Sequence, residues 1–285
     1  MSSEFVDVFF PRTGRFLRRH VPGLVNAVFP PDLQLGSCKR PELEVSLGVH
    51  DVTMRWPSLV PLIILGLAIG MYGAVRLAVP YSGRRGRPPV ATPACAISFA
   101  FYSVMCAAAL WSHCLLPRSH AWQRPAIAAD VAGTGACAFS AAYACLTGEL
   151  GRPEGVAART RKRHVLLVAS AIFLAAFLGH DLPLVHELLY VGGSVAAAVV
   201  VGRHCRRRRK VGRQALWLRM VFGGAALALA GIPLDAAMCR ALGPNANLCV
   251  TLFAGCDLLM AGLYCYVREE REAGEREGTE ARKKE

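Results

Sequence analysis

The chain has 285 residues, of which 54% are hydrophobic, and its formal net charge of +13 comes from 33 Lys and Arg against 20 Asp and Glu. These charges lie in patches between long apolar runs, whereas a soluble domain interleaves polar and apolar residues at strand or helix spacing. The apolar content also excludes a disordered chain. The sequence therefore predicts an all-α, polytopic integral membrane protein.

Apolar runs of about 20 residues, the length that crosses roughly 30 Å of hydrocarbon as a helix, follow one another from residue 57 onward. The longest run is interrupted by His180-Asp-Leu-Pro183. We interpret this run as two short spans in a hairpin, because proline disfavours helix at the residue before it. We thus predict a seven-transmembrane-helix bundle, with spans at 57–79, 90–112, 125–147, 164–180, 184–202, 214–234 and 246–267.

Basic residues divide the loops between these spans into two sets. Alternate loops hold 15 Lys and Arg, and the loops between them hold Arg118, Arg124 and Arg240. The positive-inside rule places the rich loops in the cytosol. We therefore expect residues 1–56 to be lumenal or extracellular and residues 268–285 to form a charged cytosolic tail.

The densest basic run lies in the loop from Arg203 to Arg213 and comprises Arg206, Arg207, Arg208, Arg209 and Lys210. Beside a bilayer such a run attracts anionic lipid headgroups, by about 1 kcal/mol per residue near the surface. Alternatively it only fixes the topology. Because no fold signature of nucleic-acid binding is present, we expect the lipid bilayer as the partner and no nucleic acid.

Ionisable residues inside a membrane are costly, so each requires a physical reason. Asp257 lies near the middle of the seventh predicted span, with no cation nearby in its own helix. It either forms a structural hydrogen bond to another helix or handles a proton, an ion or a substrate. Both interpretations stay open at the level of sequence.

A second group of polar residues lies at the lumenal boundary. It comprises His113, Asp130, His180, Asp181, His186, Glu187 and Asp235. Imidazole and carboxylate groups are zinc ligands, and ligands from separate helices can converge. They are also ordinary residues at the polar ends of membrane helices. His113 and Asp130 are therefore candidate metal ligands, and no motif in the sequence identifies a catalytic residue or another cofactor.

Two further features concern packing and redox state. Gly66-Leu-Ala-Ile-Gly70, continued by Gly73, is a face of small residues that lets another helix approach, within the chain or in a dimer. Four cysteines fall on or near the predicted lumenal side, where disulfides form. They are Cys38, Cys114, Cys239 and Cys249.

Two stretches carry a family resemblance. The stretch from His186-Glu-Leu-Leu-Tyr190 to His204 resembles the transmembrane protein 187 family, as does the region from Ile232-Pro-Leu-Asp235 to Gly255-Cys-Asp-Leu-Leu259. The resemblance covers residues 57–267. It implies a multi-pass protein of internal membranes with no established biochemical activity.

The architecture also resembles the seven-helix superfamily of alkaline ceramidases, progestin and adipoQ receptors and myomaker-like proteins. Its members hold zinc with a Ser-x3-His on helix two, an Asp on helix three and histidines on helix seven. His113 and Asp130 match the first His and the Asp, whereas Ala109 stands in place of the serine and helix seven has Asp257 but no histidine. The resemblance implies zinc-dependent lipid hydrolysis.

Three functions follow from these observations. The favoured one is a scaffold or interaction protein of the endomembrane system, not an enzyme, in which the polar residues are structural. The second is a divergent metal-dependent lipid hydrolase built on His113, Asp130 and Asp257. The third is an ion or small-solute carrier that uses Asp257.

Overall fold

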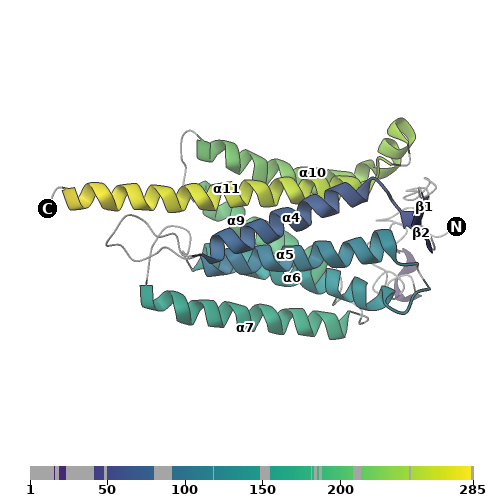
Figure 1. Ribbon diagram of the computed structural model, residues 1–285, viewed down its shortest axis with the longest axis horizontal. Coiled ribbons are helices and arrows are strands. Elements are labelled where there is room, and N and C mark those ends of the chain that lie inside the picture. Colours follow the sequence, from purple (N-terminus) through teal and green to yellow (C-terminus); the bar gives the residue numbers. More distant parts are fainter. Residues whose placement is uncertain are drawn as a thin grey trace.

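A computed structural model describes residues 42–47, 50–79, 92–117, 119–147, 155–180, 188–207, 213–243 and 245–283, together with isolated positions at 16, 19–23, 182 and 185. Helices dominate this part of the chain, and Figure 1 shows them running along the long axis of an elongated bundle. The described residues contain seven long helices. These are α4 (Leu59–Ala78), α5 (Pro93–Ala109), α6 (Gln123–Leu146), α7 (Gly155–Gly179), α9 (Gly193–Arg207), α10 (Arg213–Leu242) and α11 (Leu248–Lys283).

Four stretches within these helices are long and apolar enough to cross a membrane. They are Leu59–Ala78, Pro93–Leu115, Gln214–Gly231 and Leu248–Ala273. In α7 the apolar part, Arg163–Gly179, is shorter. The assignment to a membrane is thus confirmed by four helices, while the number of seven spans stays a prediction.

Two π-helical segments accompany the long helices. The first, η1 (Leu110–Leu115), prolongs α5, and the second, η2 (Leu188–Gly192), leads into α9. A π-turn is wider than an α-turn and is often found at functional sites. His113 lies in η1, which continues the C-terminal end of α5.

The described chain is not purely α-helical. Strands β1 (Glu42–Leu47) and β2 (His50–Arg55) form an antiparallel hairpin, with Glu42 opposite Arg55 and Leu47 opposite His50. The chain is mostly helical, as predicted, and the hairpin is an addition that the prediction lacks, because the alternation of polar and apolar residues in Glu-Leu-Glu-Val-Ser-Leu is a strand pattern that a search for long apolar runs does not detect. Figure 1 shows the hairpin at one end of the bundle and the C-terminus at the other.

The packing order of the helices follows the chain through α4, α5, α6 and α7, and α11 then returns to lie against α4. Helix α9 packs on α6, while α10 packs mainly on α11. The small-residue face of α4 is used inside the chain, because a Cβ at Gly70 would meet Ser103 of α5 and one at Gly73 would meet the ring of Phe99. This finding confirms the intramolecular alternative for that face.

Candidate functional site

The histidine and the aspartate predicted as metal ligands do lie together. His113 projects from η1 and Asp130 from the first half of α6, and Nε2 of His113 lies 3.4 Å from Oδ2 of Asp130. The histidine side chain is 40% exposed, whereas the aspartate side chain is 6% exposed. The pair therefore consists of one partly exposed and one buried side chain.

Two residues that sequence reasoning missed hold the backbone around this pair. Arg55 of β2 donates hydrogen bonds to the carbonyl oxygens of Ser112 and Leu116, and Nε2 of Gln123 donates to Ser112 at 2.8 Å. Carbonyl groups at a helix end need such partners, since the helix does not satisfy them itself. The hairpin thus fixes the turn that presents His113, and no local motif marks Arg55 for this task.

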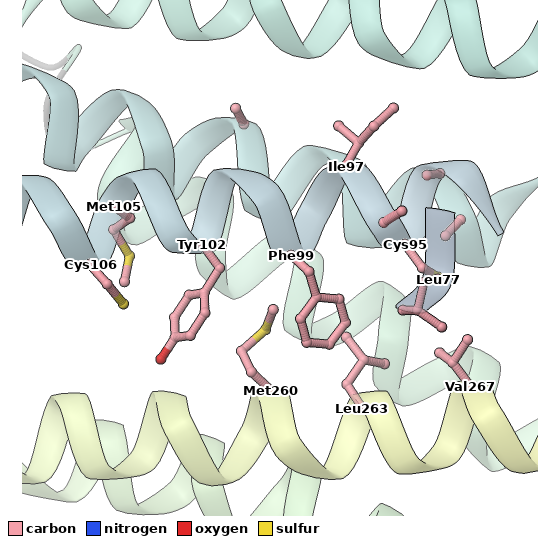
Figure 2. Close-up of a cluster of buried hydrophobic side chains, with 14 of the residues drawn as sticks. Leu77, Cys95, Ile97, Phe99, Tyr102, Met105, Cys106, Met260, Leu263 and Val267 are labelled. Atoms are coloured by element: carbon pink, nitrogen blue, oxygen red, sulfur yellow. The ribbon is translucent and has the colours of Figure 1, made fainter. Parts of the chain in front are cut away.

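Asp257, in the first third of α11, is bonded to a neighbouring helix. The hydroxyl of Tyr102 on α5 donates a hydrogen bond of 2.6 Å to Oδ1 of Asp257, and both residues are buried. Figure 2 shows the Tyr102 side chain extending from α5 toward α11, with Cys106 beside it. Oδ1 of Asp257 is therefore bonded to another helix, whereas Oδ2 needs a separate explanation.

The backbone of α4 also packs against Asp257, in addition to α5. A Cβ at Gly66 would lie 2.5 Å from Oδ1 of Asp257, 2.8 Å from Sγ of Cys106 and 3.1 Å from the hydroxyl of Tyr102. Three polar atoms from two helices thus converge on one backbone position that has no side chain. Glycine at this position is what allows α4 to close the polar centre.

Two thiol groups interact electrostatically with both Asp130 and Asp257. Asp130 and Asp257 both lie within electrostatic reach of Cys106 on α5 and Cys256 on α11. One turn before Asp257, the ring of Phe253 lies edge-on to His113 with 6.4 Å between the ring centroids. Helix α11 therefore presents an aromatic ring, rather than a ligand, to the histidine.

The donors in the described part of the chain do not fit a zinc site. No group of three or more His, Cys, Asp or Glu side chains that could hold a metal ion occurs among those residues. Structural zinc takes four protein ligands and catalytic zinc takes three. His113 and Asp130 supply two, and the side chain that faces His113 from α11 is Phe253. Two ligands alone do not make a zinc site.

We expect purified full-length protein in detergent to contain far less than stoichiometric zinc by elemental analysis, because two ligands hold the metal weakly. The His113→Ala and Asp130→Ala variants are expected to match the wild type. Near-stoichiometric zinc that both variants lose would contradict this prediction and would make the lipid hydrolase the leading hypothesis.

The other predicted lumenal residues are not shown to join this pair. His180 hydrogen-bonds the carbonyl oxygen of Phe177 at 2.9 Å, which is a local contact at the end of α7. Asp181, His186 and Glu187 lie outside the described residues, as does the side chain of Asp235. The basic run that is predicted to be cytosolic is also only partly described, since Arg206 and Arg207 end α9 with undescribed side chains and residues 208–210 lie outside the described part.

The cysteines at the predicted lumenal side differ in redox state. Cys239 is disulfide-bonded, whereas Cys114 and Cys249 are not in a disulfide bond. Cys38 lies outside the described residues. A disulfide at Cys239 fits an oxidising compartment at this end of the bundle.

A second polar site lies at the opposite end, where α11 leaves the bundle. The guanidinium group of Arg271 donates to the carbonyl oxygens of Arg76 at 3.4 Å and Val79 at 3.2 Å, at the C-terminal end of α4. Its neighbour Glu270 accepts a hydrogen bond of 3.3 Å from Gln214 at the start of α10. Both Arg271 and Glu270 are buried, so three helices are tied together at this point.

Comparisons of this chain with protein-family models, with curated proteins and with solved structures return no match. The family resemblances of the sequence therefore stay predictions. The two polar sites at opposite ends of the bundle are connected by α11.

Proposed function

We propose that this chain is a multi-pass scaffold or interaction protein of the endomembrane system, which acts through a rigid helix on the cytosolic side and not through catalysis. The observation that carries the proposal is the course of α11. This helix runs without a break from Leu248 to Lys283, and Figure 1 shows its last part extending beyond the ends of α4, α7 and α10. Residues 272–283 are named the C-terminal arm below, and they correspond to about 18 Å of helix.

The base of the arm supports this proposal. Arg271 binds the end of α4 and Glu270 binds the start of α10, so the direction of the arm is coupled to the bundle. The arm carries acidic and basic residues in close succession, a pattern typical of a solvated helix. A helix of fixed direction loses less conformational entropy on binding than a flexible tail does, which favours a role in recognition.

The predicted orientation of the chain supports a cytosolic location for this arm. In the predicted topology the loops rich in Lys and Arg are on the same side of the membrane as the arm, and the positive-inside rule assigns that side to the cytosol. The disulfide-bonded Cys239 belongs to the opposite end of α10. Anionic lipid headgroups are the partner that we propose for the basic loop from Arg203 to Arg213, which leaves the arm for protein partners.

The proposal is tested by breaking the arm at its base without changing its charge. In Ala273→Pro the ring removes a backbone donor and clashes with the preceding turn, which costs about 3 kcal/mol in a helix interior. Ala273→Ser changes the same position and keeps the helix. Proximity labelling in cells is expected to find a set of cytosolic neighbours that the proline variant loses and the serine variant keeps. Identical neighbours for both variants at equal abundance would contradict the proposal.

A further inference from the structure

The carboxylate of Asp257 has an oxygen that the fold does not use. Asp257 is 4% exposed, and its Oδ2 has no hydrogen-bond partner within the described chain. The titratable groups that face it there are Tyr102 and Cys106 from α5, its neighbour Cys256 and, farther away, Asp130 of α6. None of these groups is basic. Since unpaired polar atoms in a membrane interior are costly, Oδ2 indicates a ligand rather than a packing element.

The geometry around this carboxylate limits what the ligand can be. The backbone of Gly66 closes one side so tightly that a Cβ there would lie 2.5 Å from Oδ1. Oδ2 itself is buried from water. A hydrated ion or a metabolite therefore has no access to the carboxylate in this arrangement, whereas a proton does.

A line of ionisable groups leads from Asp257 to the lumenal end of the bundle. Cys106 and Cys256 are each within electrostatic reach of both acids. Asp130 in turn pairs with the half-exposed His113, and Oδ1 of Asp130 also has no partner in the described residues. Histidine and carboxylate groups in such a series are the side chains that relay protons through membrane proteins.

We propose that Asp257 is a proton-binding site inside the membrane, which exchanges its proton with the lumenal side through Asp130 and His113. When the site takes up a proton, an O–H bond forms at Oδ2 of Asp257, and the bond between that proton and the neighbouring group that donates it breaks. His113 then recovers a proton from lumenal water, and unloading reverses these steps. This site is separate from the C-terminal arm and adds a pH-sensitive element to the proposed interaction protein.

The proton is observed directly by infrared difference spectroscopy of the full-length protein in lipid between low and high pH. The wild type is expected to show the carbonyl stretch of a protonated carboxyl group, and the band is expected to disappear as the pH rises. Asp257→Asn keeps the shape of the side chain and is expected to lack the band. Tyr102→Phe is expected to shift it, because the hydrogen bond to Oδ1 is lost.

The route is tested by the rate at which this band shifts after transfer into heavy water. His113→Leu is expected to slow the shift by about a hundredfold, the low end of what one positioned acid–base group contributes. His120→Leu, which changes an exposed histidine at the same end, is expected to have the wild-type rate. Identical spectra for wild type and Asp257→Asn at every pH would overturn the site. A wild-type rate in His113→Leu would overturn the route. Neither result depends on a protein partner.

Discussion

Replacement of Gly224 by leucine is expected to separate α10 from α11 and to destabilise the bundle by about 3 kcal/mol or more, the upper range for added bulk in a packed interior. A Cβ at Gly224 would lie 2.5 Å from the carbonyl oxygen of Gly255 and 2.5 Å from the amide nitrogen of Leu259. These are backbone atoms, so they cannot yield unless the whole helix moves. Because α10 packs mainly on α11, little else in the described structure would hold it in place.

The neighbouring glycine provides the matched control. A Cβ at Gly223 would meet nothing within 4 Å, and this residue is exposed on the outer side of α10. Gly223→Leu is expected to be neutral or stabilising, because glycine in a helix interior costs about 1 kcal/mol relative to a good helix former. Thermal unfolding in detergent, followed with a dye that reacts with buried thiols such as Cys106, measures both variants. Equal midpoints would contradict the close packing of α10 on α11.

The helices could be predicted well from the sequence because the bilayer sets the length of an apolar run. Helices α4, α10 and α11 begin close to the predicted spans at 57, 214 and 246. Their ends were harder to predict. Helix α11 continues through a highly charged sequence, since Glu, Arg and Ala are good helix formers and a helix already formed extends easily in water. The hydropathy of the sequence does not indicate that the helix continues, so the sequence predicts only a charged tail in place of the arm.

The sequence could indicate those parts of the candidate site that depend only on the order and direction of the helices. His113 and Asp130 lie at the adjoining ends of consecutive antiparallel helices, so the sequence allows the two side chains to converge, but it does not show whether they approach each other; the structure supplies that contact. The bond between Tyr102 and Asp257 depends instead on how α5 and α11 are rotated about their axes, which apolar runs do not specify. The support that Arg55 gives to η1 depends on a hairpin contact far away in sequence, so residue spacing carries no signal for it.

The same reasoning explains why Arg271 was not recognised as a structural residue. In the sequence it is one of several arginines in a charged tail, and its neighbour Arg268 is of the same type. In the structure Arg271 is buried on two carbonyl oxygens of α4, whereas Arg268 is 63% exposed and pairs with Glu272 at 2.9 Å. The two arginines are less than one helical turn apart, and the packing of α4 against α11 alone distinguishes them.

Arg271→Gln is therefore expected to destabilise the protein by about 2 kcal/mol or more, because hydrogen bonds from a charged donor contribute roughly 1.5–3 kcal/mol and a buried partner is left unsatisfied. The positive charge of Arg271 also stabilises the end of α4, where the helix dipole is negative. Arg268→Gln removes an equal charge from the surface of the same helix. It is expected to cost less than about 1 kcal/mol, the usual range for an exposed ion pair.

Hydrogen exchange measured by mass spectrometry distinguishes loss of the anchor from general loss of stability. In Arg271→Gln, faster exchange is expected at the end of α4 and in residues 272–283, with little change around Tyr102 and Asp257. Such local opening is what a broken contact at one end of a helix produces, since stability is distributed unevenly over a fold. If exchange in the arm is already complete in the wild type, the arm is not a rigid helix in solution. The interaction function would then have to rest on another surface.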